Sequence, residues 1–134
     1  MRQNSILRFV GFTAVVFASL AASVPAFSAA ENKDMQDRYD SSVKCGAYMS
    51  YLQVLALEKK RQELKTAFGA AMFRNMREAV NLGKELGKSG KDVMAELQKA
   101  LDVHVDVNAM ELSNVKEIKA VATTCAPEII PLLK

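Results

Sequence analysis

The sequence predicts a small all-α protein: a four-helix bundle whose first and last helices are joined by one disulfide. Three observations lead to this prediction. Apolar residues recur at helical spacing through most of the chain after residue 40. Clear helix-breaking punctuation is concentrated at Gly87–Gly90, where Gly87 suits the position just after a helix. The two cysteines, Cys45 and Cys125, most economically pair with each other in an exported chain.

The first 30 residues have the order of a secretory signal peptide. Arg2 and Arg8 give a basic start, and an uncharged run follows from Phe9 to Val24. The small residues Ser28 and Ala30 favour cleavage after Ala30, with cleavage after Ser28 as the alternative. An uncleaved membrane anchor is the rival interpretation, but spanning a bilayer takes about 20 apolar residues. We therefore expect a periplasmic protein, or alternatively a secreted one, without stable membrane insertion after cleavage.

Cleavage leaves residues 31–134, enough chain for one domain and not for two. Residues 31–40 are polar, and we expect them to form a flexible lead-in to a single helical domain at 41–134. The signal segment holds two of the 18 basic residues and none of the 15 acidic ones, so the remaining chain is nearly neutral. Nucleic acid usually requires a concentrated basic face, so the charge balance argues against it as a partner.

The first helix is expected from Ser41 to Leu57, around an uncharged run that begins at Cys45. A second helical region extends to Leu86, because no proline interrupts it and its apolar residues keep helical spacing. The chain must turn somewhere within residues 59–69 if the two helices pack antiparallel, and Gly69 is a hint of that turn. One long helix from residue 41 to 86 is the alternative.

The third helix is expected to open at Ser89, with Asp92 as its capping-box partner. The alternating segment Val103–Asn108 is interpreted as the end of that helix and an extended link. Asn108 then starts the last main helix, which Pro127 ends because the residue before a proline is disfavoured in the helical region. The apolar tail that follows is predicted to be a short turn laid against the bundle.

The composition offers little for catalysis. The chain has one histidine, so a two-histidine metal site cannot form within it. The one candidate metal set is Asp102, His104 and Asp106, whose alternate side chains would share one side of an extended segment. The alternative is a histidine in a link between two solvated acids. No cofactor is expected, since the sequence contains neither a haem-attachment motif nor a glycine-rich phosphate loop.

Two further features are candidate binding surfaces. The basic run Lys59–Arg61 could hold an anionic partner, or could be a solvated helix end. Met72, Met76 and Met94 lie at helical spacing among other apolar residues, so a place in the core is the default interpretation. The sharper interpretation is a flexible methionine-lined groove for apolar clients or peptides.

These observations rank three classes of function. The first is a non-enzymatic interaction protein, such as an inhibitor or immunity protein of an envelope hydrolase or a stress holdase, with another envelope protein as partner. The second is a carrier of a small ligand or metal in the bundle core, and the third is a small enzyme of unknown type. In layout alone the chain resembles small periplasmic acid-stress chaperones and immunity proteins of secreted cell-wall amidases. The partner's identity and the oligomeric state stay open.

Overall fold

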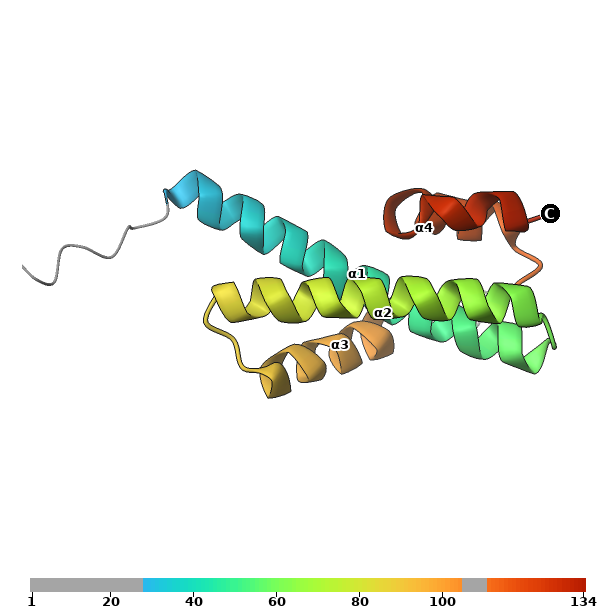
Figure 1. The fold of residues 1–134 in the computed structure, drawn as a ribbon, viewed down its shortest axis with the longest axis horizontal. Coiled ribbons are helices and arrows are strands. Elements are labelled where there is room, and N and C mark those ends of the chain that lie inside the picture. Colours follow the sequence, from blue (N-terminus) through green and yellow to red (C-terminus); the bar gives the residue numbers. More distant parts are fainter. Residues whose placement is uncertain (1–27, 105–110) are drawn as a thin grey trace, which may run out of the picture.

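The computed structural model describes residues 28–104 and 111–134, and the described chain is helical without strands. Its elements are α1 (Ala29–Glu58), α2 (Gln62–Glu85), α3 (Gly90–His104), α4 (Val115–Cys125) and the 3-10 helix η1 (Pro127–Leu132). The two long helices, α1 and α2, form an antiparallel hairpin (Figure 1). The shorter α3 and α4 pack at different ends of this hairpin (Figure 1). The predicted small all-α fold and the disulfide are confirmed.

The first helix begins at Ala29, not near Ser41, so residues 31–40 are helical and not a flexible lead-in. A capping box starts it: the backbone N–H of Glu31 donates to the hydroxyl of Ser28 at 3.2 Å. In return the backbone N–H of Ser28 donates to the Glu31 carboxylate at 3.1 Å. Both bonds satisfy amide groups that have no partner within the helix.

Burial of Tyr39 is the physical reason why this polar segment is helical. Its side chain is completely buried in the contact between α1, α2 and α3, which stabilises the turns on either side. Met35, four residues earlier, packs partly against the same core, but two apolar residues among acids and amides are a weak helical signal. Cleavage after Ala30 would remove Ser28, and the mature helix would then start without its cap.

The hairpin turn falls within residues 59–69, as predicted, and the alternative of one long helix is wrong. Lys60 takes a left-handed conformation, with φ of 56°. This lets the N–H of Arg61 bond back to the carbonyl of Ala56 at 2.8 Å. The bond closes the last turn of α1 and reverses the chain.

The turn between α2 and α3 also has the chemistry that the sequence predicts. Gly87 has φ of 79°, and the N–H of Lys88 bonds to the carbonyl of Gly83 at 2.8 Å, which ends α2. The N–H of Asp92 donates to the hydroxyl of Ser89 at 3.1 Å, and the N–H of Ser89 donates to the Asp92 carboxylate at 3.0 Å. The predicted capping box of α3 is therefore confirmed.

The last main helix is shorter than predicted, since it begins at Val115 and not near Asn108. Asn108 itself lies outside the described residues. Glu111 to Asn114 form a turn, in which the N–H of Asn114 bonds to the carbonyl of Glu111 at 2.9 Å. The hydroxyl of Ser113 bonds to the Glu111 carboxylate at 3.1 Å. Local bonds of this kind compete with helix formation.

Two separate apolar cores flank the hairpin. The disulfide core lies among α1, α2, α4 and η1 and consists of Cys45, Met49, Leu52, Ala56, Leu64, Phe68, Ala71, Ile118, Ala122, Cys125, Ala126, Ile129 and Leu133. The α3 core lies among α1, α2 and α3 and consists of Tyr39, Val43, Ala47, Ala79, Leu82, Val93, Leu97 and Ala100. The tail after α4 contributes Ala126, Ile129 and Leu133 to the disulfide core. It therefore lies against the helices, as predicted.

Two glycines of α2 allow close approach between helices. Gly69 lies inside α2 and not in the turn, and a Cβ there would be 2.6 Å from the side-chain nitrogen of Gln53. At Gly83 a Cβ would be 2.6 Å from Val93 Cγ2 and 3.1 Å from Tyr39 Cε2. Gly69 is therefore a contact residue of the α1–α2 hairpin, and the hint of a turn at this position is wrong.

Candidate functional site

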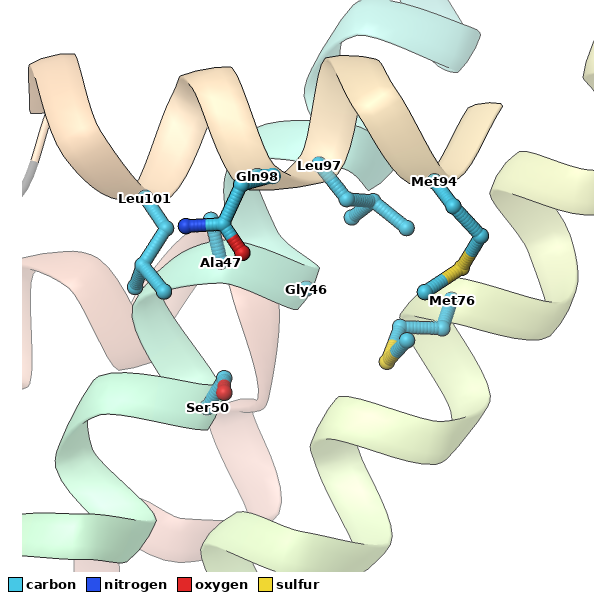
Figure 2. Close-up of a pocket in the computed structure, with 8 residues that line it drawn as sticks. All are labelled: Gly46, Ala47, Ser50, Met76, Met94, Leu97, Gln98 and Leu101. Carbon is cyan, nitrogen blue, oxygen red and sulfur yellow. The ribbon is translucent and has the colours of Figure 1, made fainter. Parts of the chain in front are cut away.

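A groove opens to solvent between α1, α2 and α3, with a cavity volume of about 120 Å³. Figure 2 shows the three helices around it and the side chains that line it. The lining consists of Gly46, Ala47 and Ser50 from α1, Met76 from α2, and Met94, Leu97, Gln98 and Leu101 from α3. The groove is therefore mostly apolar, with one hydroxyl and one amide.

The floor of the groove is built from small residues of α1. A Cβ at Gly46 would lie 3.1 Å from Leu97 Cδ2 and 3.2 Å from Met76 Cγ, closer than most such contacts. Ala47 is buried beneath α3, and Ser50 is half-buried. Larger side chains at these positions would fill the space between α2 and α3, so the groove exists because the floor is small.

Two methionines line the groove from different helices. Met76 extends from α2 and Met94 from α3, and in Figure 2 both lie on the side of the groove away from Ser50. Helical spacing placed Met94 on the inner face of its helix, but 51% of it is exposed. Met72 packs against the disulfide core instead. The side chain of methionine is unbranched and polarizable, and it adapts to varied apolar surfaces.

Exposed apolar side chains continue the groove. The large hydrophobic residues exposed in the described chain are Val54, Leu57, Phe73, Val80 and Met94, all on α1, α2 or α3. On α1, Val54 follows Ser50 by one helical turn, and Leu57 follows Val54 by another. On α2, Phe73 and Val80 lie one turn before and after Met76. These side chains therefore share helix faces with groove residues. We call the groove and these five side chains the apolar surface. Phe73 is its most exposed member, at 69%.

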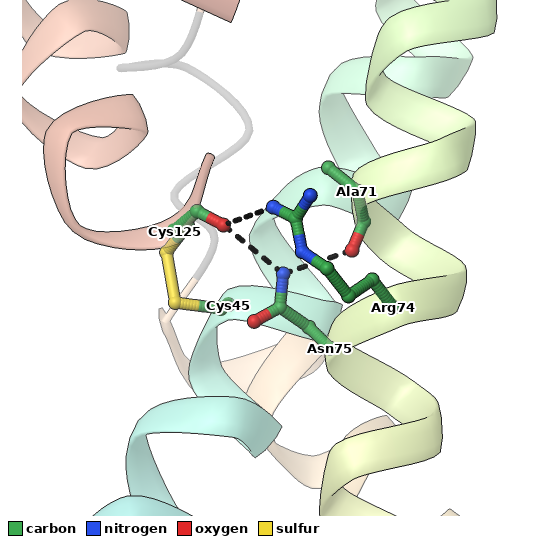
Figure 3. Close-up of a disulfide and its surroundings, with 5 residues drawn as sticks. All are labelled: Cys45, Ala71, Arg74, Asn75 and Cys125. Atoms are coloured by element: carbon green, nitrogen blue, oxygen red, sulfur yellow. Dashed lines mark hydrogen bonds between the residues drawn. A yellow bond between two sulfur atoms is a disulfide. The ribbon is translucent and has the colours of Figure 1, made fainter. Parts of the chain in front are cut away.

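The disulfide has surroundings that hold it in place. Cys45 and Cys125 have a Cα–Cα distance of 5.2 Å and join α1 to the end of α4. The carbonyl oxygen of Cys125 accepts bonds from the Arg74 guanidinium at 3.1 Å and the Asn75 amide at 3.2 Å (Figure 3). Asn75 is buried and also donates to the carbonyl of Ala71 at 2.8 Å. These bonds satisfy polar groups at the helix end and support a structural role for the disulfide.

The same arginine also fastens η1. Arg74 forms an ion pair with Glu128, and this hydrogen bond holds the pKa of the Glu128 carboxyl below its ordinary value. Both side chains are about half exposed, so solvent screens the pair and its contribution to stability is below about 1 kcal/mol.

A second polar cluster lies beside the α3 core. The Lys88 ammonium is 2.7 Å from the Glu96 carboxylate and 5.1 Å from the centre of the Tyr39 ring. Burial raises the pKa of the Tyr39 hydroxyl, and the nearby Glu96 carboxylate raises it further. The Tyr39 hydroxyl nevertheless makes no hydrogen bond of good geometry within the described chain. It stays neutral at physiological pH, which suits packing and not proton transfer.

The candidate metal set is only partly described. Asp102 is exposed and accepts a hydrogen bond from the Gln98 amide at 2.9 Å. The helix α3 ends at His104. Asp106 lies outside the described residues, and the metal set stays a prediction. The described residues contain no cluster of metal-binding side chains.

The basic run lies at the turn between α1 and α2. Lys59, Lys60 and Arg61 are exposed and make no ion pair with any described residue. None of the described helices combines the length and apolar character needed to cross a membrane.

Comparison with known proteins finds no matching family, no similar curated protein and no similar solved structure. Sequence reasoning had singled out Met76 and Met94 but missed the floor of the groove. A signal was present, because Gly46, Ala47 and Ser50 are small residues close together in an otherwise mostly bulky apolar run. Small residues on a helix indicate either a close contact with another helix or a gap between helices. Only the position of α3 shows that here they form the floor of a groove.

Proposed function

We propose that the protein is an exported, non-enzymatic interaction protein that holds an apolar segment of another envelope polypeptide in the groove between α1, α2 and α3. One observation carries the proposal: the partly exposed Met76 and Met94 line the groove together with the small residues of its floor. An inhibitor or immunity protein would hold one fixed partner there, and a holdase would hold many.

The size of the groove favours a polypeptide side chain over a whole small molecule. Pockets for drug-sized ligands usually have volumes of about 300–1,000 Å³, whereas this cavity measures about 120 Å³. It fits one or two apolar side chains whose backbone remains outside. This weighs against the alternative of a small-ligand carrier.

The chemistry of the lining supports binding over catalysis. Its polar members are Ser50 and Gln98, and neither is an effective acid or base near neutral pH. Export is supported by the signal-like first 30 residues and by the disulfide, since such bonds persist in oxidising compartments.

Site-specific photo-crosslinking tests the proposal. A photoreactive amino acid replaces Met94 in the groove or, as a control, Lys116 on α4. We expect crosslinked envelope protein from position 94 and none from position 116. One sharp product would indicate an inhibitor or immunity protein, and a broad distribution would indicate a holdase.

A groove-filling variant makes the test specific. Ser50→Leu adds apolar volume to the floor of the groove and should abolish the crosslink from position 94. Ser41→Leu is the matched control, because Ser41 is exposed on the same helix and does not line the groove. Crosslinks that persist in Ser50→Leu, or equal yields from positions 94 and 116, would contradict the proposal.

A further inference from the structure

The apolar surface is longer than the groove and has the spacing of a helix-binding site. On α2, the apolar side chains Phe73, Met76 and Val80 follow one another by three and four residues. They span about 10 Å, the rise of two helical turns. An amphipathic partner helix presents its apolar anchors at the same spacing, over the same length. A surface of this length therefore matches the apolar face of a partner helix better than it matches one inserted side chain.

Positive charges border this surface along α2 and the start of α3, whereas on α1 the exposed Glu58 lies one turn from Val54. Arg77 and Lys84 on α2, and Lys91 on α3, each lie one helical turn from an exposed apolar side chain of the surface. All three are exposed, and none makes an ion pair with a described residue. The acid Glu78 on α2 is instead directed to Arg38 on α1, at 3.3 Å.

The acids of α3 are mostly engaged elsewhere. Asp92 caps the helix through Ser89, and Glu96 pairs with Lys88. Each is two residues from Met94, about 200° around the helix from that groove wall. Asp102 is the acid on the groove side, where it accepts a bond from the Gln98 amide. The unpaired charge beside the α2 wall and the start of α3 is therefore positive.

We infer that the occupant of the groove is one amphipathic helix of another protein, with acidic residues beside its apolar stripe. This inference rests on the proposed function and names the chemistry of its partner. Charge complementarity favours it, since acidic flanks would meet Arg77, Lys84 and Lys91 while apolar anchors enter the groove beside Met76 and Met94. A flat anionic membrane surface would meet the same charges but could not enter the groove between α1, α2 and α3.

Two synthetic helical peptides of about 18 residues, roughly 27 Å long, test the inference with the oxidised protein. They share one leucine stripe and differ only in their flanking residues, glutamate in one and lysine in the other. We expect the glutamate peptide to bind about tenfold more tightly, the combined effect of two or three exposed charge pairs. Its affinity should fall as salt is added.

Matched charge reversals locate the effect. The double variant Arg77→Glu/Lys84→Glu should reverse the preference between the two peptides. The control Lys116→Glu/Lys119→Glu makes the same change of net charge on α4 and should leave the preference as it is. Methyl NMR signals of Met76 and Met94 should shift on binding, whereas that of the buried Met49 should not.

The outcomes separate this inference from the proposed function. Equal affinity for the two peptides, with the crosslink from position 94 intact, overturns the inference and leaves the proposed function standing. Failure of both peptides to bind, together with loss of the crosslink, overturns both. If neither peptide binds but anionic phosphatidylglycerol vesicles do, and Arg77→Glu/Lys84→Glu abolishes this binding, the surface recognises membrane and the inference is wrong.

Discussion

The disulfide core and the α3 core stabilise the same hairpin in different ways. In the disulfide core α4 is tied to α1 by Cys45–Cys125 and to α2 by bonds from Arg74 and Asn75 to the Cys125 carbonyl. In the α3 core the third helix is held by apolar packing and by the Lys88–Glu96 pair, without a covalent bond. The exposed large hydrophobic residues of the described chain all lie outside α4 and η1.

The two ends of the hairpin are therefore held by different kinds of interaction. One end is crosslinked by the disulfide, which resists unfolding. The other end has a groove whose wall, α3, is held by apolar packing and the Lys88–Glu96 pair, without a disulfide. The residues that crosslink one end therefore differ from those that line the groove, so substitutions can test the comparison.

The largest effect is expected from the double variant Cys45→Ser/Cys125→Ser. The disulfide closes a loop with a sequence separation of 80, and its loss should lower the free energy of unfolding by about 4 kcal/mol in the chain-entropy model. Thermal unfolding followed by circular dichroism measures this directly. Wild-type protein under reducing conditions is the control and should melt like the variant. An unchanged melting temperature would mean that the disulfide does not stabilise this end of the hairpin.

Tyr39→Ala should destabilise the α3 core by about 3–5 kcal/mol, because it removes a completely buried aromatic ring. Tyr39→Phe keeps the ring and removes a hydroxyl that makes no hydrogen bond of good geometry, so it should be neutral or slightly stabilising. Urea unfolding of the two variants gives both values. A cost above about 1 kcal/mol for Tyr39→Phe would mean that the hydroxyl is bonded to Glu96.

Two phenylalanines of α2 compare a core position with the apolar surface. Phe73→Ser should change the free energy of unfolding by less than about 0.5 kcal/mol, since Phe73 is 69% exposed. The same variant should weaken binding of the glutamate peptide by about tenfold, as loss of a central apolar anchor does. Phe68→Ser, in the disulfide core, should instead prevent stable folding. Unchanged peptide affinity in Phe73→Ser would exclude this residue from the binding surface.

The smallest effects are expected from acid pH at the two ion pairs. Arg74 lowers the pKa of Glu128, and Lys88 lowers that of Glu96, from the ordinary value of 4.5. Each pair therefore contributes stability above the unfolded-state pKa, and that contribution is lost as the pH falls through the folded-state pKa. Both glutamates are partly exposed, so each contributes less than about 1 kcal/mol.

Glutamine variants of the two acids measure these contributions. Glu128→Gln and Glu96→Gln should each lower stability slightly at neutral pH and flatten its decline in acid, in denaturant titrations over a range of pH. Glu128→Gln reports on the attachment of η1 to the disulfide core, and Glu96→Gln on the attachment of α3. If the free energy of unfolding of a variant declines in acid as steeply as that of the wild type, the corresponding ion pair does not contribute to stability.

Features set by local chemistry could be predicted from the sequence. Gly87 adopts the left-handed conformation that ends α2, and Ser89 and Asp92 form the capping box that opens α3. Such signals act within a few residues, so neighbours in sequence are enough to specify them. The start of α1 was missed for the opposite reason, because residues 31–40 are helical through the distant packing of Tyr39.

The sequence by itself determined the helical class of the protein, the pairing of its two cysteines and the methionines available for a groove. Only the tertiary structure decided which apolar face each short helix covers. Helical spacing assigns residues to faces of a helix but does not say which neighbour packs there. Because α4 covers the face of α1 with Cys45 and α3 covers only part of the other, Ser50 and Val54 are left beside a groove. The groove is thus a property of the packing of three helices and is absent from any one of them.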